Sequence, residues 1–225
     1  MGRRGLSGLS RIRIEDSLRQ GGCPVCSLVS RDVVEFLKSF LYEYVNDPGA
    51  RRRFRESLGL CPHHAWLLAR IVREPDVMDF LGATILYEDV LSTYLESGLE
   101  YRVGECMVCR YVLELEESYC RSISAYFREH GVKAYEDSKA VLCSRHFERV
   151  YELSGELRGE LKRVHAGKLR GILELMRSYI RKTDYASREE ASAEEARAWL
   201  RAIEALKGRE DSYYSSEWVR RRWSR

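Results

Sequence analysis

The chain has 225 residues, of which 44% are hydrophobic and 32% are charged, and its formal net charge is +3. A chain of this length can bury a core without the metal ion that a very small domain needs. No apolar run approaches the ~20 residues that cross a bilayer, so no membrane span is predicted. The first 14 residues carry arginines but no apolar stretch of the kind found in a secretion signal, and we expect a cytoplasmic protein.

The chain contains one asparagine, Asn46, and one glutamine, Gln20. Depletion of these thermolabile side chains is typical of hyperthermophiles, so we infer a thermophilic source. Cytoplasmic proteins of hyperthermophiles can contain disulfides, which weakens the rule that cytoplasmic cysteines stay reduced. The spacing of the cysteines therefore has to decide between metal binding and disulfides.

We interpret residues 1–20 as a basic N-terminal arm and residues 21–100 as a first helical repeat. The repeat opens with Cys23-x-x-Cys26, after which apolar residues step by threes and fours over residues 29–44, as one face of a helix requires. The rest of the repeat is predicted to be a stop at Asp47-Pro48-Gly49, a short helix over 51–57, the pair Cys61-x-x-His64, a helical stretch over 66–72 and a linking helix over 76–99.

A second repeat over residues 101–155 has the same order of features. It contains Cys106-x-x-Cys109, a helical pattern over 112–127, a stop at His130-Gly131, the pair Cys143-x-x-His146 and a helical stretch over 147–153. The Cys/Cys pair is displaced by 83 residues between the copies and the Cys/His pair by 82, so a single deletion relates them. This pattern indicates an internal duplication.

C-terminal helices are predicted over residues 156–208, followed by a basic aromatic tail over residues 209–225. Ser192 and Glu195 form a capping box for the last helix, which we expect to end near Gly208. No stretch has the alternating pattern of a strand. The predicted fold class is all-α: a duplicated helical zinc-binding unit, made of CxxC, a long helix, a short helix and CxxH, plus C-terminal helices.

The repeated pairs have the spacing of zinc ligands, because two residues separated by two others on a tight turn both reach one ion. We predict two structural zinc ions, each bound by the three cysteines and one histidine of one repeat. The predicted ligands are Cys23, Cys26, Cys61 and His64 for one ion, and Cys106, Cys109, Cys143 and His146 for the other. Four protein ligands leave no open position for water or substrate, so both sites are expected to be structural.

The register of the repeat also sorts the remaining candidates. His64, and not His63, is the counterpart of His146, so His63 is expected at the surface. Cys120 falls at the position of Leu37 on the buried helix face and is interpreted as a small core residue. The histidines without a counterpart are expected at helix ends or on the surface: His130 and His165. Disulfides within the CxxC pairs and an iron–sulfur cluster stay open as alternatives to zinc.

Several longer segments resemble an uncharacterised prokaryotic zinc-binding family with duplicated CxxC/CxxH units, domain of unknown function 6062. The resemblance covers roughly residues 20–208, and its implication is zinc at the matched cysteines and histidines, with no activity, substrate or catalytic residue. The segments that carry it are Cys-Pro-Val-Cys (23–26), Leu-Tyr-Glu-Tyr-Val-Asn-Asp-Pro (41–48), Leu-Cys-Pro-His-His-Ala (60–65), Ile-Leu-Tyr-Glu-Asp (85–89), Tyr-Ile-Arg-Lys-Thr-Asp-Tyr (179–185) and Glu-Glu-Ala-Arg-Ala-Trp-Leu-Arg-Ala-Ile (194–203).

The function that we favour is a non-enzymatic adaptor whose basic termini bind RNA, a ribonucleoprotein or the ribosome. Residues 1–20 and residues 212–225 each have a net charge of +3, which leaves −3 for the residues between them. Guanidinium groups can pair with phosphates, and aromatic rings can stack on bases. The candidate nucleic-acid-binding residues are Arg3, Arg4, Arg11, Arg13, Trp218, Arg220, Arg221, Arg222, Trp223 and Arg225.

Two other classes of function stay open. One is a protein–protein interaction module without nucleic acid, and a short basic tail can also be simply solvated. The other is a thiol-based redox switch or enzyme that uses the cysteines or the carboxylates of Glu114, Glu116 and Glu117. The sequence contains no phosphate-binding loop, nucleophile motif or open metal site, so no catalytic residue is predicted.

Overall fold

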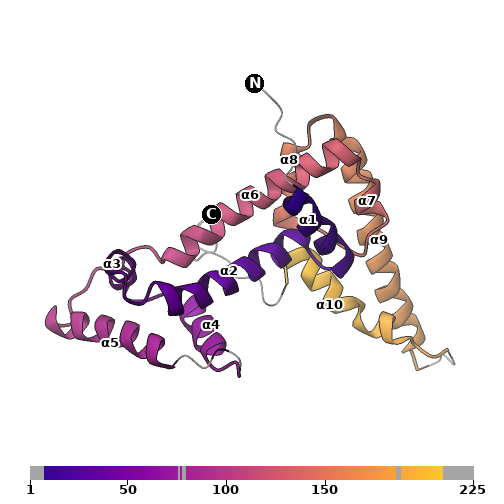
Figure 1. Cartoon of the computed structure of the whole chain (residues 1–225). Helices are drawn as coiled ribbons and strands as arrows, with labels where there is room; N and C mark the ends of the chain where they lie inside the picture. Colours follow the sequence, from indigo (N-terminus) through magenta and orange to yellow (C-terminus); the bar gives the residue numbers. More distant parts are fainter. Residues whose placement is uncertain (1–7, 76, 78–79, 186–188, 210–225) are drawn as a thin grey trace. The chain divides into compact units, whose positions relative to one another are not determined.

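A computed structural model describes residues 8–75, 77, 80–185 and 189–209 of the chain. Over these residues the chain is helical and contains no strand, so the predicted all-α fold class is confirmed (Figure 1). Among the described helices, none is both long enough and apolar enough to cross a membrane.

The described residues divide into two compact units, and neither unit corresponds to one repeat. Unit 1 consists of residues 8–28 and 116–209, and unit 2 consists of residues 29–115. Two long helices, α2 (Pro24–Glu43) and α6 (Met107–His130), each contribute residues to both units. Each unit therefore contains parts of both repeats, and the segment limits predicted from the sequence do not coincide with the units.

Unit 2 combines parts of α2 and α6 with three further helices: α3 (Pro48–Glu56), α4 (Pro62–Val72) and α5 (Phe80–Glu96). The Asp47 carboxylate caps α3 by accepting a hydrogen bond from the Ala50 N–H at 2.6 Å. The core of unit 2 contains aromatic contacts. The ring of Phe40 stacks on that of Phe54 with centroids 5.6 Å apart. The Asp89 carboxylate of α5 accepts hydrogen bonds from two arginines of α3, Arg51 and Arg55.

Unit 1 combines the other parts of α2 and α6 with α1 (Gly8–Gln20), α7 (Lys133–Glu136), α8 (Ser144–Leu153), the 3-10 turn η1 (Gly155–Leu157), α9 (Arg158–Lys182) and α10 (Ala193–Lys207). Helices α9 and α10 lie side by side and run in opposite directions (Figure 1). The capping box of Ser192 and Glu195 is present, and α10 ends before Gly208, whose φ of 95° suits glycine. Much of the predicted basic arm is the packed helix α1, which buries Ile14 and Leu18.

Candidate metal centres

The eight predicted ligand side chains gather into two groups of four, and each group could hold a metal ion. Each group takes its Cys/Cys pair from one repeat and its Cys/His pair from the other. Site 1 consists of Cys23, Cys26, Cys143 and His146, and site 2 consists of Cys61, His64, Cys106 and Cys109. Site 1 lies in unit 1 and site 2 lies in unit 2. The prediction that each site belongs to a single repeat is therefore wrong.

A long helix separates the cysteine pair of the first repeat from its Cys/His pair. Cys23 directly precedes α2, whose 20 residues carry the chain about 30 Å along the helix axis. The residues between the end of α2 and Cys61 include the short helix α3 and non-helical segments on both sides of it, so their length alone does not decide which cysteine pair Cys61 meets. The Cys/His pair of the first repeat instead meets the cysteine pair at the start of α6. The spacing of the ligands in the sequence therefore does not show which two pairs share a site.

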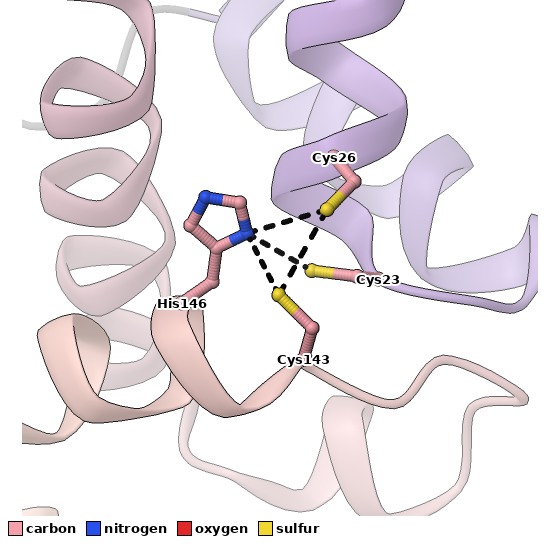
Figure 2. Close-up of side chains that lie close together, drawn as sticks. All are labelled: Cys23, Cys26, Cys143 and His146. Carbon is pink, nitrogen blue, oxygen red and sulfur yellow. Dashed lines mark hydrogen bonds between the residues drawn. The ribbon is translucent and has the colours of Figure 1, made fainter. Parts of the chain in front are cut away.

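The four side chains of site 1 converge on a common centre, with the imidazole facing the three sulfurs (Figure 2). The Nδ1 atom of His146 lies 3.3 Å from the Cys23 sulfur, 3.4 Å from the Cys26 sulfur and 3.2 Å from the Cys143 sulfur. The sulfurs of Cys26 and Cys143 are 3.9 Å apart. All four residues are buried.

The four side chains of site 2 have nearly the same arrangement. The Nδ1 atom of His64 lies 3.2 Å from the Cys61 sulfur, 3.7 Å from the Cys106 sulfur and 3.5 Å from the Cys109 sulfur. The sulfurs of Cys61 and Cys109 are 3.6 Å apart. Three of these residues are buried, whereas Cys61 is partly exposed.

These distances fit a tetrahedral zinc ion. With Zn–S bonds of about 2.3 Å and Zn–N bonds of about 2.0 Å, ideal tetrahedral edges are roughly 3.8 Å between sulfurs and 3.5 Å between sulfur and nitrogen. The sulfur–sulfur distances are 3.9 and 3.6 Å, and the sulfur–nitrogen distances run from 3.2 to 3.7 Å. The three thiols and one imidazole of each group could therefore coordinate one such ion through Sγ and Nδ1.

The start of a short helix positions each Cys/His pair. Cys61 and Cys143 are the N-cap residues of α4 and α8, with extended ψ values of 158° and 159°, and each histidine follows within the first turn. The exposed N–H groups and the macrodipole of a helix N-terminus favour negative charge. Both cysteine sulfurs can therefore be held as thiolates at these positions with support from the backbone.

A backbone hydrogen bond near each site joins the segment before the cysteine pair to the segment before the Cys/His pair. In unit 1 the Val141 N–H donates to the Gly22 carbonyl at 2.9 Å, and in unit 2 the Gly104 N–H donates to the Glu56 carbonyl at 2.7 Å. A Cβ atom at Gly104 would lie 2.6 Å from that carbonyl oxygen, so only glycine allows the approach. These bonds bring the distant ligand pairs together without a continuous sheet.

The thiols of both groups resist ionisation when no metal ion lies between them. Burial raises the pKa of the Cys23 thiol well above its usual range, and the neighbouring groups of Cys106 and Cys109 raise the pKa of Cys61. Three thiols packed this tightly cannot all be ionised without a cation between them. Metal binding at either site therefore has to displace protons from the sulfurs.

A buried ion pair lies behind the histidine of site 1. The Nε2 atom of His146 is 3.5 Å from a carboxylate oxygen of Glu116, and the same oxygen accepts a short hydrogen bond from Arg145. Both charged side chains are largely buried, with 13% and 14% of their surface exposed. A carboxylate at the outer nitrogen of a ligating histidine fixes the ring and raises its basicity as a ligand.

Site 2 does not repeat this ion pair. The register of the duplication places Val33 at the position of Glu116 and His63 at the position of Arg145. Val33 is fully buried, whereas His63 is exposed, as predicted, and its ring meets that of His64 edge to face. The two sites therefore share their ligands and differ in the residues around the histidine.

A second buried network supports the Cys143 segment, and the sequence analysis missed it. His165, expected at a helix end or on the surface, lies inside α9 and stacks on Phe147 with centroids 4.0 Å apart. Burial lowers its pKa to about 4, so the ring is neutral at neutral pH. The hydroxyl of Tyr135 lies 2.9 Å from its Nδ1 and accepts a hydrogen bond from the N–H of Leu142, the residue before Cys143.

The acidic run considered as a catalytic cluster has three different environments. Glu116 faces His146 and Arg145, and Glu117 accepts hydrogen bonds from Arg149 and Arg121, so both side chains join α6 to neighbouring charges. Glu114 is exposed. One signal in the sequence pointed to Glu116: in the register of the two repeats, this charged residue is the counterpart of Val33, an apolar residue of the first repeat's predicted buried helix face.

The other candidates are placed as follows. Cys120 is fully buried on α6 and belongs to neither group of four, in agreement with its interpretation as a core residue. His130 is exposed at the end of α6. Arg11 pairs with Glu15, and the guanidinium of Arg13 lies over the ring of Tyr119. The remaining nucleic-acid-binding candidates lie outside the described residues: Arg3, Arg4, Trp218, Arg220, Arg221, Arg222, Trp223 and Arg225.

Comparisons of the chain with protein-family models, with curated proteins and with solved structures found no match.

Proposed function

We propose that the protein is a non-enzymatic helical adaptor, held together by two structural zinc ions, whose basic termini bind RNA or a ribonucleoprotein. The observation that supports the structural role is the geometry of the two groups of four. Each group supplies a complete tetrahedron of protein ligands, which leaves no position for a substrate or a reactive water. Sites of this kind contribute metal-binding free energy to folding and not to a reaction.

The ligand chemistry supports zinc over its rivals. Thiolate and imidazole ligands in a tetrahedron suit Zn²⁺. The Nδ1 atom of each histidine faces the sulfurs at the distances expected between two ligands of one ion. The cysteines of both CxxC pairs are free, with no disulfide within either pair. Elemental analysis of protein purified without chelator should give two zinc ions per chain. A value of one, or a mass that shows disulfides in place of metal, would contradict this part of the proposal.

Charge supports the polyanion part of the proposal. Residues 1–20 and 212–225 each have a net charge of +3, and the tail also contains Trp218 and Trp223. Contacts between arginines and phosphates release counterions, so an affinity that depends on them falls steeply with salt. Ring stacking on bases is less sensitive to salt and contributes ~1–3 kcal/mol per base.

A truncation tests this part directly. Removing residues 210–225 keeps α10 and Gly208, and it should weaken binding to structured RNA and flatten the salt dependence while zinc content and helicity stay unchanged. The double variant Trp218→Ala with Trp223→Ala separates stacking from charge, because it should lower the affinity and leave the salt slope intact. Equal RNA binding by the truncated and full-length proteins, or no binding by either, would refute RNA recognition through the tail.

One observation favours a protein–protein interaction module as the second candidate. Helix α5 exposes a series of large apolar side chains, among them Leu91 and Leu95, with 58% and 62% of their surface accessible. Contiguous apolar surface of this kind is typical of interfaces. We also propose, on the segments quoted above, that the chain belongs to the family called domain of unknown function 6062.

A further inference from the structure

Helix α5 is apolar on two sides. Its inner side buries Gly82, Leu86 and Val90. Its outer side exposes a row of large apolar residues at helical spacing, which we call the α5 face: Phe80, Leu91 and Leu95. Tyr87 lies at the border of this row, and its ring packs edge to face on the buried Phe54. The row runs for about 22 Å along the helix, since each residue advances the axis by about 1.5 Å. A helix that is apolar all round is normally buried, so the α5 face is expected to be covered in the working protein.

The charged residues of helix α5 are all acidic, and one of them, Asp89, is paired with Arg51 and Arg55 of α3. Helix α5 contains no lysine or arginine. Glu88 and Glu96 are exposed, and Glu88 lies three residues before Leu91 and seven before Leu95, on the same side of the helix. A complementary surface should therefore combine apolar side chains with basic ones.

The same chain carries such a surface on α9 and α10. Ala205 packs with Ile172, and Lys182 bonds to Glu195, so these two contacts fix the antiparallel register of the pair. The exposed apolar residues of the two helices lie one or two turns from each other in this register, and we call them the α9/α10 face: Leu173, Ile180, Trp199, Ile203 and Leu206.

Helical geometry places these residues on one side of the pair. Trp199 and Leu206 each follow a buried contact residue of α10 by one position, and Leu173 follows the buried Ile172 of α9 in the same way. Ile180 lies seven residues after Leu173, on the same flank of its helix. Successive residues of a helix are rotated by about 100° around its axis. In an antiparallel pair, the residues that follow the buried contact residues by one position therefore lie on the same side of the pair. The apolar residues therefore form a common surface.

Exposed arginines border this surface. Arg170 and Arg177 lie three residues before and four residues after Leu173, and Arg181 follows Ile180. Arg177 also pairs with Glu174 of the same helix at 3.0 Å. Helix α9 as a whole contains eight lysines and arginines against two glutamates, a net charge of +6 with histidine neutral. The α9/α10 face is thus apolar with a basic border, whereas the α5 face is apolar with an acidic border.

We propose that the α5 face of one copy of the chain docks on the α9/α10 face of a second copy. Apolar burial supplies the attraction, and Glu88 and Glu96 opposite Arg170 and Arg177 select the pairing. Contact between two α5 faces is disfavoured because it would bring Glu88 and Glu96 of the two copies close to one another. The proposed contact joins unlike surfaces, so a single contact between two copies leaves one unused face of each kind.

The test is self-association measured by light scattering and sedimentation over a wide range of protein concentration, on the full zinc-loaded chain. The wild-type protein should form dimers and larger species as the concentration rises. An α5 variant, Leu91→Gln with Leu95→Gln, and an α10 variant, Trp199→Gln with Ile203→Gln, should each be monomeric. Leu9→Gln is the matched control, since Leu9 is exposed on α1, a helix that carries neither face. Unchanged helicity and zinc content show that each variant is folded.

Mixing separates the proposed contact from its alternatives. An equimolar mixture of the α5 variant and the α10 variant should form a dimer and no larger species, because one intact face of each kind remains. Glu88→Lys with Glu96→Lys should weaken association, and adding Arg170→Glu with Arg177→Glu in the same chain should restore it. A wild-type protein that is monomeric at every concentration would overturn the proposal. So would an α10 variant that still dimerises, because that result identifies contact between two α5 faces.

Discussion

Site 1 and site 2 are the same group of ligands in two different surroundings. In each, a Cys/Cys pair before a long helix meets a Cys/His pair at the start of a short helix, and the histidine faces the sulfurs through Nδ1. Site 1 is buried at all four residues and has the ion pair of Glu116 and Arg145 behind its histidine. Site 2 leaves Cys61 partly exposed and has Val33 and His63 at the corresponding positions.

The difference teaches that the same four side-chain types can gather in two different surroundings within one chain. A ligating histidine with a carboxylate at its outer nitrogen holds metal more tightly than one without, and a partly exposed sulfur gives chelators and oxidants a point of attack. We therefore expect site 1 to be the more inert of the two sites. The predictions that follow test the exchange of ligands first and the difference between the sites second.

The largest effect is expected from pairs of cysteine substitutions. Cys61→Ser with Cys106→Ser removes two ligands of site 2 alone, so this variant should keep one zinc ion per chain. Cys106→Ser with Cys143→Ser removes one ligand from each site, so this variant should keep none or bind both ions weakly. Elemental analysis after gel filtration measures the stoichiometry.

The two variants exchange their results if each site belongs to a single repeat. In that arrangement Cys61 and Cys106 would serve different ions, whereas Cys106 and Cys143 would serve the same one. One retained zinc ion in the Cys106→Ser, Cys143→Ser variant, together with none in the other, would restore the pairing predicted from the sequence.

Metal removal should separate the sites in time. A chromogenic chelator should extract zinc in two phases, and the fast phase should belong to site 2 because Cys61 is partly exposed. We expect the rates to differ by about tenfold or more, the scale of effects from residues around metal ligands. The variant that lacks site 2 should show only the slow phase. Its melting temperature should fall further as the remaining zinc is removed, and a melting temperature that stays constant would contradict a structural role for the ion.

A smaller effect is expected from Glu116→Gln, which keeps the shape of the side chain and removes the charge behind His146. Zinc affinity at site 1 should fall by roughly 10- to 100-fold, measured by competition with a chelator. Glu114→Gln, an exposed position on the same helix, is the matched control and should leave both affinities unchanged. An equal loss in the two variants would assign the effect to the general charge of α6.

The smallest effect is expected from Cys120→Ala. Cys120 is fully buried and belongs to neither site, so both zinc ions should remain. The cost is a small cavity, and stability should fall by about 1 kcal/mol, as for other small losses of buried volume. Thermal melting and elemental analysis measure the two outcomes, and the loss of one zinc ion would identify Cys120 as a ligand.

The sequence by itself determined the helices and the ligand types. Local spacing indicates a helix, so the apolar steps over residues 29–44 and 112–127 located α2 and α6, and the capping box at Ser192 located the start of α10. The duplication distinguished His64 from His63 and Cys120 from the ligands, because a repeat compares each residue with its counterpart. These features depend on neighbours within a few turns of the chain.

Only the tertiary structure decided which ligands share an ion. Cys23 and Cys26 meet Cys143 and His146, whereas Cys61 and His64 meet Cys106 and Cys109, and the spacing of these residues in the sequence does not decide between this pairing and the one within each repeat. The ion pair of Glu116 and Arg145 and the burial of His165 likewise depend on packing between helices that are distant in the sequence. The repeat pattern identifies the ligand residues of each copy, but the path of the folded chain determines which ligand pairs share a site.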